Sequence, residues 1–392
     1  MGTVRKGVEV SIAMADAVAQ SDVDVIAAYP ITPQTHIVEH LADIVANGEL
    51  DAEFVPVDSE HSAMSVCCGS SAVGARTFTS TSSQGLALMS EIFFITAAMR
   101  FPVVMALANR SLSGPLSIWN DHTDVMMVRD SGWIQIFVEN GQEAYDSVFN
   151  AFRIGEDPKV MLPVAINLDG FILTHMIEPV EYEDDDIIKK YLPEFKMKNA
   201  LHPDHPVSMG CFAMPEIYTE AQKVREAGII DSYPVILKAW DEWGRLTGRY
   251  YRPIETYRAE DAEYCIVTMG SYGETAMEVV DRLREEGEKV GVVKIRLFRP
   301  FPFEEFRKAV LGKKSLIVID RAISFGGPGG PAALEVRSAL YNKKGAPAIV
   351  NYVAGLAGRD VSRKAMRSII LEGKKKAASG DTDGYVLYGL RE

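Results

Sequence analysis

The sequence is poor in cysteine, and its cysteines are not spaced to share a metal. The four cysteines are Cys67, Cys68, Cys211 and Cys265, and no two of them form a C-x-x-C pair. Cys67 and Cys68 are adjacent within a stretch of small apolar residues, which is typical of packing residues. We therefore expect this chain to hold no iron–sulfur cluster by itself.

Long apolar runs are also absent. The most apolar stretch, Leu86 to Ala108, is interrupted by Glu91 and Arg100, whereas a membrane-spanning helix needs about 20 nearly uncharged residues. The N-terminal MGTVRKGVEV contains neither the apolar core nor the cleavage site of an export signal. We expect a cytoplasmic protein without a membrane partner.

Positive charge is in deficit. Lys and Arg total 41 against 54 Asp and Glu, which gives a formal net charge of −13. Nucleic acids and anionic membranes attract basic surfaces, so we expect neither as a partner. The sequence also lacks the G-x-G-x-x-G and Walker A patterns. Two glycine-containing loops, Met269–Gly273 and Gly326–Gly330, are only weak candidates for phosphate binding.

What the sequence does contain is a regular alternation of strand-like and helix-like segments up to about residue 180. This alternation predicts an α/β domain with a parallel sheet covered by helices on both faces. The expected strands are Val25–Tyr29, Glu53–Val57, Arg76–Ser80, Val103–Ala108, Ile134–Val138 and Val160–Ile166. The expected helices are Gln34–Ala46, Glu60–Val73, Gln84–Met99 and Gln142–Ile154.

A different composition separates this domain from a second one. Residues 181–255 are rich in charge and turn formers and include one helical stretch, Ala221–Trp243. We interpret them as a connecting arm that contacts another subunit, or else as a solvated linker. A smaller α/β domain is expected over residues 256–392. Its strands are Tyr264–Met269, Val290–Ile295, Leu316–Asp320 and Ala348–Val353, and its helices are Glu274–Glu286, Phe303–Leu311 and Ala332–Tyr341.

Polar segments follow three of the expected strands directly. They are Tyr29–Pro33 (YPITP), residues 58–61 (DSEH) and residues 109–115 (NRSLSGP). Ligands of parallel sheets bind at the carboxyl ends of the strands, so these segments are placed to build one site.

Each segment also has a purely structural interpretation. Thr32 could hold a substrate in a stiff loop between two prolines, or could cap the following helix. Glu60 could be a buried carboxylate of raised pKa, or part of a helix cap. Arg110 could bind an anionic substrate, or pair with Asp121 or Asp124. For His122, which lies between these two acids, a structural hydrogen bond is favoured over proton transfer.

Taken together, the motifs resemble the alpha subunit of the pyruvate:ferredoxin oxidoreductase (pyruvate synthase) family of 2-oxoacid:ferredoxin oxidoreductases. The resemblance keeps the family order over nearly the whole chain. It rests on YPITP at 29–33, SEHSA at 59–63, TSSQGLALM at 81–89, NRSLSGPLSIWNDHTDV at 109–125, RDSGWIQIFVENGQEAYD at 129–146, LFRPFP at 297–302, VAGLAGRD at 353–360 and YVLYGL at 385–390.

This resemblance implies a thiamine-enzyme pyrimidine-binding domain followed by a transketolase-C-terminal-like domain. It implies oxidative decarboxylation of a 2-oxoacid with coenzyme A as co-substrate and ferredoxin as electron acceptor. Thiamine diphosphate would be shared with a beta subunit that holds the diphosphate and Mg²⁺ through a Gly-Asp-Gly motif, which this sequence lacks. The [4Fe-4S] clusters would belong to partner chains among the beta, gamma and delta-type subunits.

The resemblance also implies roles for single residues. Glu60 matches the glutamate that hydrogen-bonds the cofactor's pyrimidine, in a site that includes Pro30 and Ile31. Thr32 and Arg110 match the residues beside the substrate and its carboxylate. Gly114 departs from the alanine of many relatives, which leaves branched-chain and aromatic 2-oxoacids open. The rival functions are a non-catalytic scaffold subunit and a nicotinamide-dependent reductase, and the missing G-x-G-x-x-G argues against the reductase.

Overall fold

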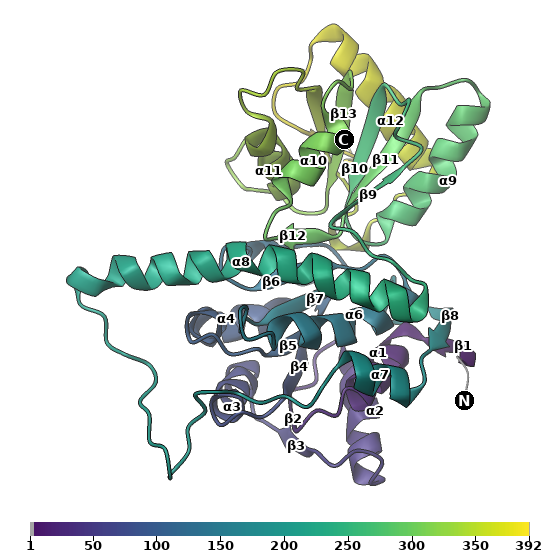
Figure 1. The fold of residues 1–392 in the computed structure, drawn as a ribbon. Helices are drawn as coiled ribbons and strands as arrows, with labels where there is room; N and C mark the ends of the chain where they lie inside the picture. The colour runs from purple at the N-terminus through teal and green to yellow at the C-terminus, as the bar shows by residue number, and fades with distance from the viewer. Residues whose placement is uncertain (1–3, 392) are drawn as a thin grey trace.

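The computed structural model describes residues 4–391 and contains two open sheets and one short ribbon (Figure 1). The seven-stranded sheet has the order β12-β6-β7-β5-β4-β2-β3, and the six-stranded sheet has the order β15-β14-β13-β10-β11-β9. β1 (Val4–Glu9) and β8 (Ile177–Tyr182) form a separate antiparallel pair. Within the described residues, no helix is long and apolar enough to cross a membrane.

Six strands of the seven-stranded sheet run parallel, so their carboxyl ends meet at one edge. They are β2 (Val25–Ala28), β3 (Glu53–Pro56), β4 (Thr77–Thr81), β5 (Val104–Asn109), β6 (Ile134–Phe137) and β7 (Val164–Asp169). The connections that follow β2 and β4 run in opposite directions along the sheet, and such switch points are where parallel sheets bind ligands. β4 and β5 lie in the middle of the sheet. Both are buried along their whole length, as expected for central strands.

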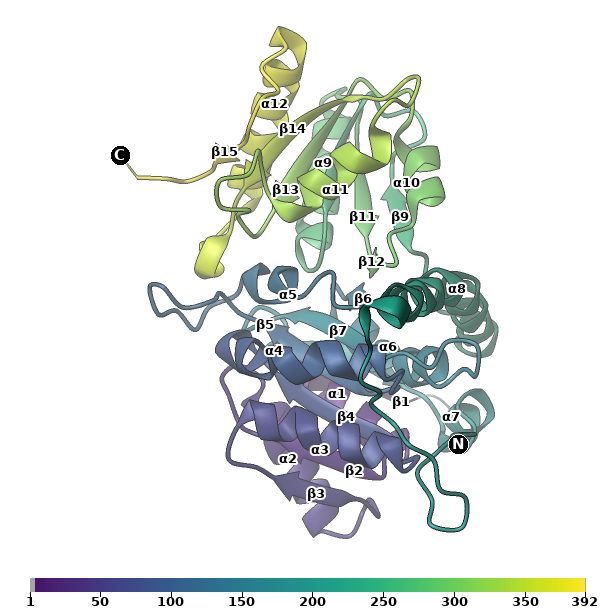
Figure 2. The same ribbon diagram turned by 90° about the vertical axis from the view of Figure 1, so that its left-hand side faces the viewer.

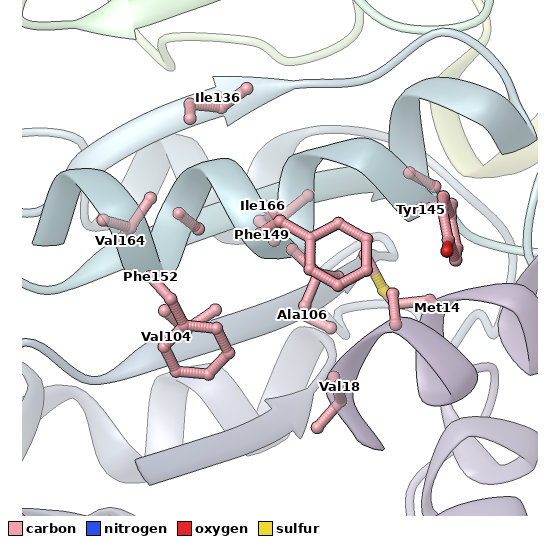
Figure 3. Packing of buried hydrophobic residues seen from close by; sticks show 14 of the residues in the cluster. Met14, Val18, Val104, Ala106, Ile136, Tyr145, Phe149, Phe152, Val164 and Ile166 are labelled. Atoms are coloured by element: carbon pink, nitrogen blue, oxygen red, sulfur yellow. The ribbon is translucent and has the colours of Figure 1, made fainter. Parts of the chain in front are cut away.

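Helices cover both faces of this sheet (Figure 2). On one face, Val104 and Ala106 of β5 pack in a core with α1 (Val10–Gln20), α2 (Thr35–Ala46) and α6 (Gly141–Gly155). Phe149 and Phe152 of α6 lie against these strands (Figure 3). On the other face, the alternate β5 residues pack with α3 (Glu60–Ala72), α4 (Ser83–Ala98) and α5 (Thr123–Met127). Because successive side chains of a strand point to opposite faces, β5 contributes residues to both cores.

The second sheet combines β9 (Ile254–Tyr257), β10 (Tyr264–Thr268), β11 (Val290–Ile295), β13 (Ser315–Asp320), β14 (Ala348–Val353) and β15 (Val386–Leu387). One face is covered by α9 (Tyr272–Glu285) and α12 (Arg363–Ser379), and the other by α10 (Phe303–Val310) and α11 (Pro331–Leu340). The core beneath α10 and α11 is continuous with that beneath α3 and α4, so the two sheets share apolar packing.

Neither sheet is wholly parallel. β9 pairs antiparallel with β11, and β12 (Leu297–Arg299) pairs antiparallel with β6. β12 follows β11 along the chain but pairs with β6. The second part of the chain therefore supplies an edge strand to the seven-stranded sheet. The LFRPFP sequence therefore marks a junction between the two sheets.

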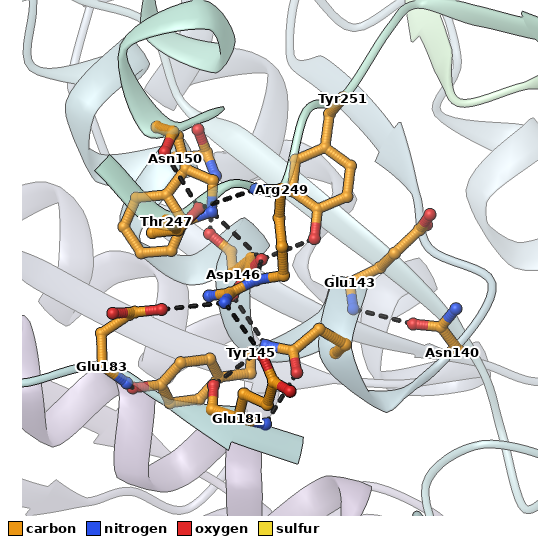
Figure 4. A network of polar contacts seen from close by, with 12 residues as sticks. Asn140, Glu143, Tyr145, Asp146, Asn150, Glu181, Glu183, Thr247, Arg249 and Tyr251 are labelled. Atoms are coloured by element: carbon orange, nitrogen blue, oxygen red, sulfur yellow. Dashed lines mark hydrogen bonds and ion pairs between the residues drawn. The ribbon is translucent and has the colours of Figure 1, made fainter. Parts of the chain in front are cut away.

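The segment between the sheets contains α7 (Asp185–Tyr191) and α8 (Pro215–Thr247), a 33-residue helix that extends beyond the predicted Ala221–Trp243. α8 lies between the first sheet's helices and the second sheet (Figure 1). Its C-terminal part is fixed to α6 by the buried carboxylate of Asp146. This carboxylate accepts hydrogen bonds from Trp243 Nε1 at 3.0 Å, Arg249 Nε at 2.7 Å and Tyr251 Oη at 2.5 Å (Figure 4).

Candidate active site

The loop after β2 is held in place by Gln34, a fully buried residue that the motif analysis did not single out. Its Nε2 donates to the Tyr29 carbonyl at 3.0 Å, and its Oε1 accepts from Ser80 Oγ at 2.8 Å. Helix α2 starts at Thr35 with Gln34 as its N-cap residue, so Thr32 does not cap it. Pro30 and Thr32 are exposed and Ile31 is half-buried, which leaves this loop accessible at the sheet edge.

Glu60 is the first residue of α3, and its side chain is buried despite its charge. The cap of α3 is Ser59, whose Oγ accepts from the Ser62 N–H at 3.2 Å, so Glu60 is not needed as the cap. Burial raises the pKa of the Glu60 carboxyl, and a backbone hydrogen bond partly opposes this shift. Its carboxylate forms no ion pair within residues 4–391, which leaves it available to a ligand.

Arg110 follows β5, and its guanidinium has no acidic partner in the described part of the chain. Nη1 donates to the Thr32 carbonyl at 2.9 Å and Nε donates to the Ser117 carbonyl at 2.9 Å. Nη2 makes no hydrogen bond to any described residue. Burial lowers the pKa of Arg110, and the nearby Asp124 opposes this shift. The structure thus joins two of the predicted residues, Thr32 and Arg110.

Asp124 contacts the Arg110 backbone rather than its head group. This fully buried carboxylate accepts from the N–H groups of Arg110 at 2.9 Å, Ser83 at 3.1 Å and Val125 at 2.7 Å, and from Asn109 Nδ2 at 3.1 Å. Burial raises the pKa of Asp124 to about 7, although the hydrogen bonds lower it. Asp124 therefore ties the start of α4 to the end of β5.

His122 pairs with Asp169 at the end of β7 rather than with either neighbouring acid. Its Nε2 lies 3.0 Å from Asp169 Oδ1, and both side chains are buried. Asp169 also accepts from Arg321 Nη1 at 2.6 Å and from the Ser271 N–H at 2.9 Å. This cluster joins the two sheets, and it confirms that His122 makes a structural hydrogen bond. The Met269–Gly273 loop thus directs an N–H group at a protein carboxylate, not at a free phosphate site.

The three predicted segments thus meet at one edge of the first sheet, while several residues that organise them escaped the sequence analysis. Asp169 and Gln34 are isolated polar residues outside the matched motifs, and Asp124 was considered only as a partner of the Arg110 side chain. Gly85 lies within the TSSQGLALM motif, but nothing in that motif distinguished it. A Cβ atom there would lie 2.6 Å from Glu60 Oε1 and 2.8 Å from Glu60 Cγ, so only glycine leaves room for the Glu60 side chain.

Comparison with known families covers both parts of the chain. Residues 16–236 match the family described as "Pyruvate flavodoxin/ferredoxin oxidoreductase, thiamine diP-bdg". Residues 262–366 match the family described as "Pyruvate:ferredoxin oxidoreductase core domain II". The first match contains Thr32, Glu60 and Arg110.

The solved structures of similar fold belong to enzymes of related architecture. A 2-oxoglutarate:ferredoxin oxidoreductase from Magnetococcus marinus aligns with a TM-score of 0.70 at 18% identity, over 95% of this chain. The present chain spans 65% of that longer one. A split-gene transketolase aligns with a TM-score of 0.55 at 13% identity, over 94% of this chain and 99% of its own. These likenesses support the predicted fold of a thiamine-enzyme domain with a transketolase-like second domain.

Curated relatives match this chain along nearly its full length. The pyruvate synthase subunit PorA of Methanocaldococcus jannaschii is 45% identical over 97% of this chain and 96% of its own. The same subunit of Thermotoga maritima is 46% identical over 97% of this chain and 96% of its own. The ketoisovalerate oxidoreductase subunit VorA of Pyrococcus furiosus is 42% identical over 98% of each chain. The chain therefore belongs to the pyruvate:ferredoxin oxidoreductase family.

Proposed function

We propose that this chain provides the pyrimidine-binding half of a thiamine diphosphate site in an enzyme that oxidatively decarboxylates pyruvate. The observation that carries the proposal is the joint placement of Glu60, Thr32 and Arg110 at one sheet edge within the thiamine-binding family match. The acceptors of the reaction are coenzyme A, which receives the acyl group, and ferredoxin, which receives the electrons.

The residues at this edge fit the cofactor. Several buried hydroxyl groups have no hydrogen-bond partner within residues 4–391, among them Thr81 Oγ1, Ser82 Oγ and Ser111 Oγ. Buried polar groups without partners are costly, so such a cluster is typical of a site completed by a ligand. Glu60 would hold the pyrimidine ring from a buried position, beside Pro30 and Ile31. When bound, the cofactor supplies the electron sink for decarboxylation.

Glu60 can share a proton with a ring nitrogen because burial keeps its pKa above that of an exposed glutamate. Arg110 supplies a cation whose Nη2 is free to donate to a substrate carboxylate, and Thr32 is exposed beside it. The carbonyl groups of Thr32 and Ser117 hold the guanidinium in a fixed orientation. The conformational entropy of this side chain is therefore already lost before the substrate binds, which favours binding.

Pyruvate is favoured over a branched-chain 2-oxoacid by the comparisons, since two PorA relatives exceed the VorA relative in identity. Gly114 does not argue for a larger substrate. Its φ is +122°, a backbone conformation that favours glycine, and a Cβ atom there would meet nothing within 4 Å. Glycine therefore serves the backbone of the loop. Branched-chain and aromatic 2-oxoacids remain the second candidate substrates.

The rest of the site belongs to partner chains in this proposal. A beta-type subunit holds the diphosphate and Mg²⁺, and gamma and delta-type subunits complete the complex, with the [4Fe-4S] clusters on these partners. Ferredoxin docks mainly on a partner, because ferredoxins are usually acidic and this chain carries a net charge of −13. We place the complex in the cytoplasm. Within this chain, residues 1–180 form the pyrimidine-binding domain, residues 181–255 the connecting arm and residues 256–392 the transketolase-C-terminal-like domain in this proposal.

The test is a panel of 2-oxoacids assayed on the purified complex with coenzyme A and ferredoxin, together with the thiamine diphosphate content. We expect the highest kcat/KM for pyruvate and one cofactor per copy of this chain. A complex without thiamine diphosphate would contradict the catalytic role. A complex with the cofactor that prefers 2-oxoisovalerate or an aromatic 2-oxoacid would correct the substrate alone.

A further inference from the structure

Gly85, on the first turn of α4, is flanked by the side chains of Glu60 and Thr81. A Cβ atom at position 85 would overlap Thr81 Oγ1 and would lie 2.6 Å from Glu60 Oε1. Both oxygens therefore contact the same face of this glycine, although they come from different elements. Glu60 begins α3, and Thr81 is the last residue of β4.

The Thr81 hydroxyl is fully buried and has no hydrogen-bond partner among the described residues. Thr79, two residues earlier on the same face of β4, is satisfied, because its Oγ1 donates to the Ala27 carbonyl at 2.8 Å. Leaving a buried hydroxyl unpaired costs free energy that valine at the same position would avoid. A partner that needs the hydroxyl is the simplest physical reason for threonine here.

Several polar groups close to Glu60 in the chain or on α4 are engaged with other partners. Asp58, on the preceding turn, accepts from Ser62 Oγ at 2.6 Å. His61 faces Glu91 of α4 at 3.5 Å, and its side chain is 41% exposed. Gln84 is bound to Ser83 Oγ at 2.6 Å and to the Ser113 N–H at 3.1 Å. Within residues 4–391, Thr81 is thus an unengaged donor, and its hydroxyl shares the Gly85 face with the Glu60 carboxylate.

We propose that Thr81 is a positioning residue for Glu60: once the cofactor site is assembled, its hydroxyl donates a hydrogen bond to the Glu60 carboxylate. The absence of a side chain at Gly85 leaves the room for this pair to form. Thr81 acts through Glu60 and does not itself touch the reacting atoms. The inference rests on the proposed role of Glu60 toward the cofactor. The hydrogen bond would fix the rotamer of the carboxylate and favour its charged form.

The experiment compares Thr81→Val with Thr81→Ser in the assembled complex freed of its cofactor. The carboxyl band of Glu60 is followed by infrared spectroscopy against pH, and it is assigned by its loss in Glu60→Gln. We expect the Glu60 titration to move to higher pH in Thr81→Val and to return toward wild type in Thr81→Ser. The melting temperature of Thr81→Val should fall only slightly, because Glu60 alone would lose a hydrogen bond.

A second pair of variants keeps the inference testable if Thr81→Val does not fold. Gly85→Ala should displace Glu60, whereas Gly69→Ala adds the same methyl group to α3, where a Cβ atom meets nothing within 4 Å. Alanine is the better helix former, so neither should lose helix stability for that reason. After the cofactor is restored, exchange of its C2 proton should slow at least about tenfold in Gly85→Ala and in Thr81→Val, and stay at the wild-type rate in Gly69→Ala.

The outcomes separate this inference from the proposal beneath it. An unshifted Glu60 titration together with wild-type exchange in Thr81→Val would overturn the role of Thr81. Wild-type exchange in Gly85→Ala would likewise remove Gly85 from the account. If Glu60→Gln itself exchanges at the wild-type rate, the role assigned to Glu60 is wrong, whatever the Thr81 variants do.

Discussion

The guanidinium of Arg110 donates to the backbone carbonyl of Thr32 at 2.9 Å and pairs with no carboxylate among the described residues. The end of β5 is thereby joined to the loop after β2. These segments are separated in the sheet by β4. A buried cation that is oriented but not neutralised is suited to bind an anionic substrate.

Arg110→Ala should weaken catalysis without unfolding the protein. Loss of a charge-assisted contact should cost about 2–4 kcal/mol of transition-state stabilisation in kcat/KM for pyruvate. The melting temperature should change little, because no buried acid loses its partner. Arg110→Lys should restore activity only in part, since an ammonium group lacks the planar geometry.

Arg249→Ala is the matched control for this arginine. Arg249 pairs with Asp146 and with Glu183 Oε1 at 2.8 Å, far from the predicted site residues along the chain (Figure 4). Its removal should lower the melting temperature strongly and leave kcat per folded molecule near wild type. The opposite pattern, a large loss of stability in Arg110→Ala with normal kinetics, would assign Arg110 a structural role.

Asp169→Asn should loosen the junction between the two sheets. Burial alone would raise the pKa of Asp169, but the Arg321 guanidinium and the His122 contact outweigh it and hold this pKa well below its usual range. The carboxylate therefore contributes stability above the ordinary pKa of aspartate, which is lost only as pH falls through the folded-state pKa. Removing the charge takes away the ion-pair partner of the buried Arg321, at a cost of about 3–5 kcal/mol.

Urea unfolding at neutral pH measures this loss, with Asp261→Asn as the control. Asp261 pairs with Arg284 at 2.8 Å, but its side chain is 70% exposed, so its replacement should change the unfolding midpoint little. Equal effects of the two substitutions would show that the Asp169 cluster is not the main polar tie between the sheets.

The Glu60 carboxyl should also leave a signature in the pH dependence of stability. Burial raises its pKa in the folded chain above the ordinary 4.5. Between the unfolded and folded values the folded state binds more protons, so the wild-type free energy of unfolding declines as pH rises through this window. Glu60→Gln has no titrating carboxyl at this position, so its stability should not decline in this way. The melting temperature of the variant relative to that of wild type should therefore rise from acidic toward neutral pH. Parallel curves for the two proteins would mean that the Glu60 pKa is not raised by folding.

Sequence patterns predicted the strands that are apolar on both faces, because continuous apolar runs mark buried parallel strands. One strand of the first sheet, β7, was misplaced. Val160–Ile166 was expected, but β7 spans Val164–Asp169, since Met161 has φ of +45° and Pro163 has no N–H group. β1 and β12 were missed because VRKGVE is largely polar and LFR is too short to carry a pattern.

The predicted site residues came from motifs placed at strand ends, and the structure brings their segments to one edge of the sheet. Thr81 and Gly85 were part of a matched motif, yet nothing in it distinguished them. Their relation to Glu60 depends on how α3 and α4 pack across β4, and Asp169 depends on the docking of the second sheet. Such contacts are set by tertiary packing between distant segments, which local periodicity does not encode.

Exchange of the thiamine C2 proton in Glu60→Gln tests the central claim most directly. Wild-type and variant complexes, both loaded with thiamine diphosphate, are mixed with deuterium oxide, quenched within milliseconds and analysed by NMR. The account predicts that exchange slows about 10²–10⁴-fold, the usual size of a general acid–base contribution, while the fold remains intact. An exchange rate within about threefold of wild type would contradict it and show that another group activates the cofactor.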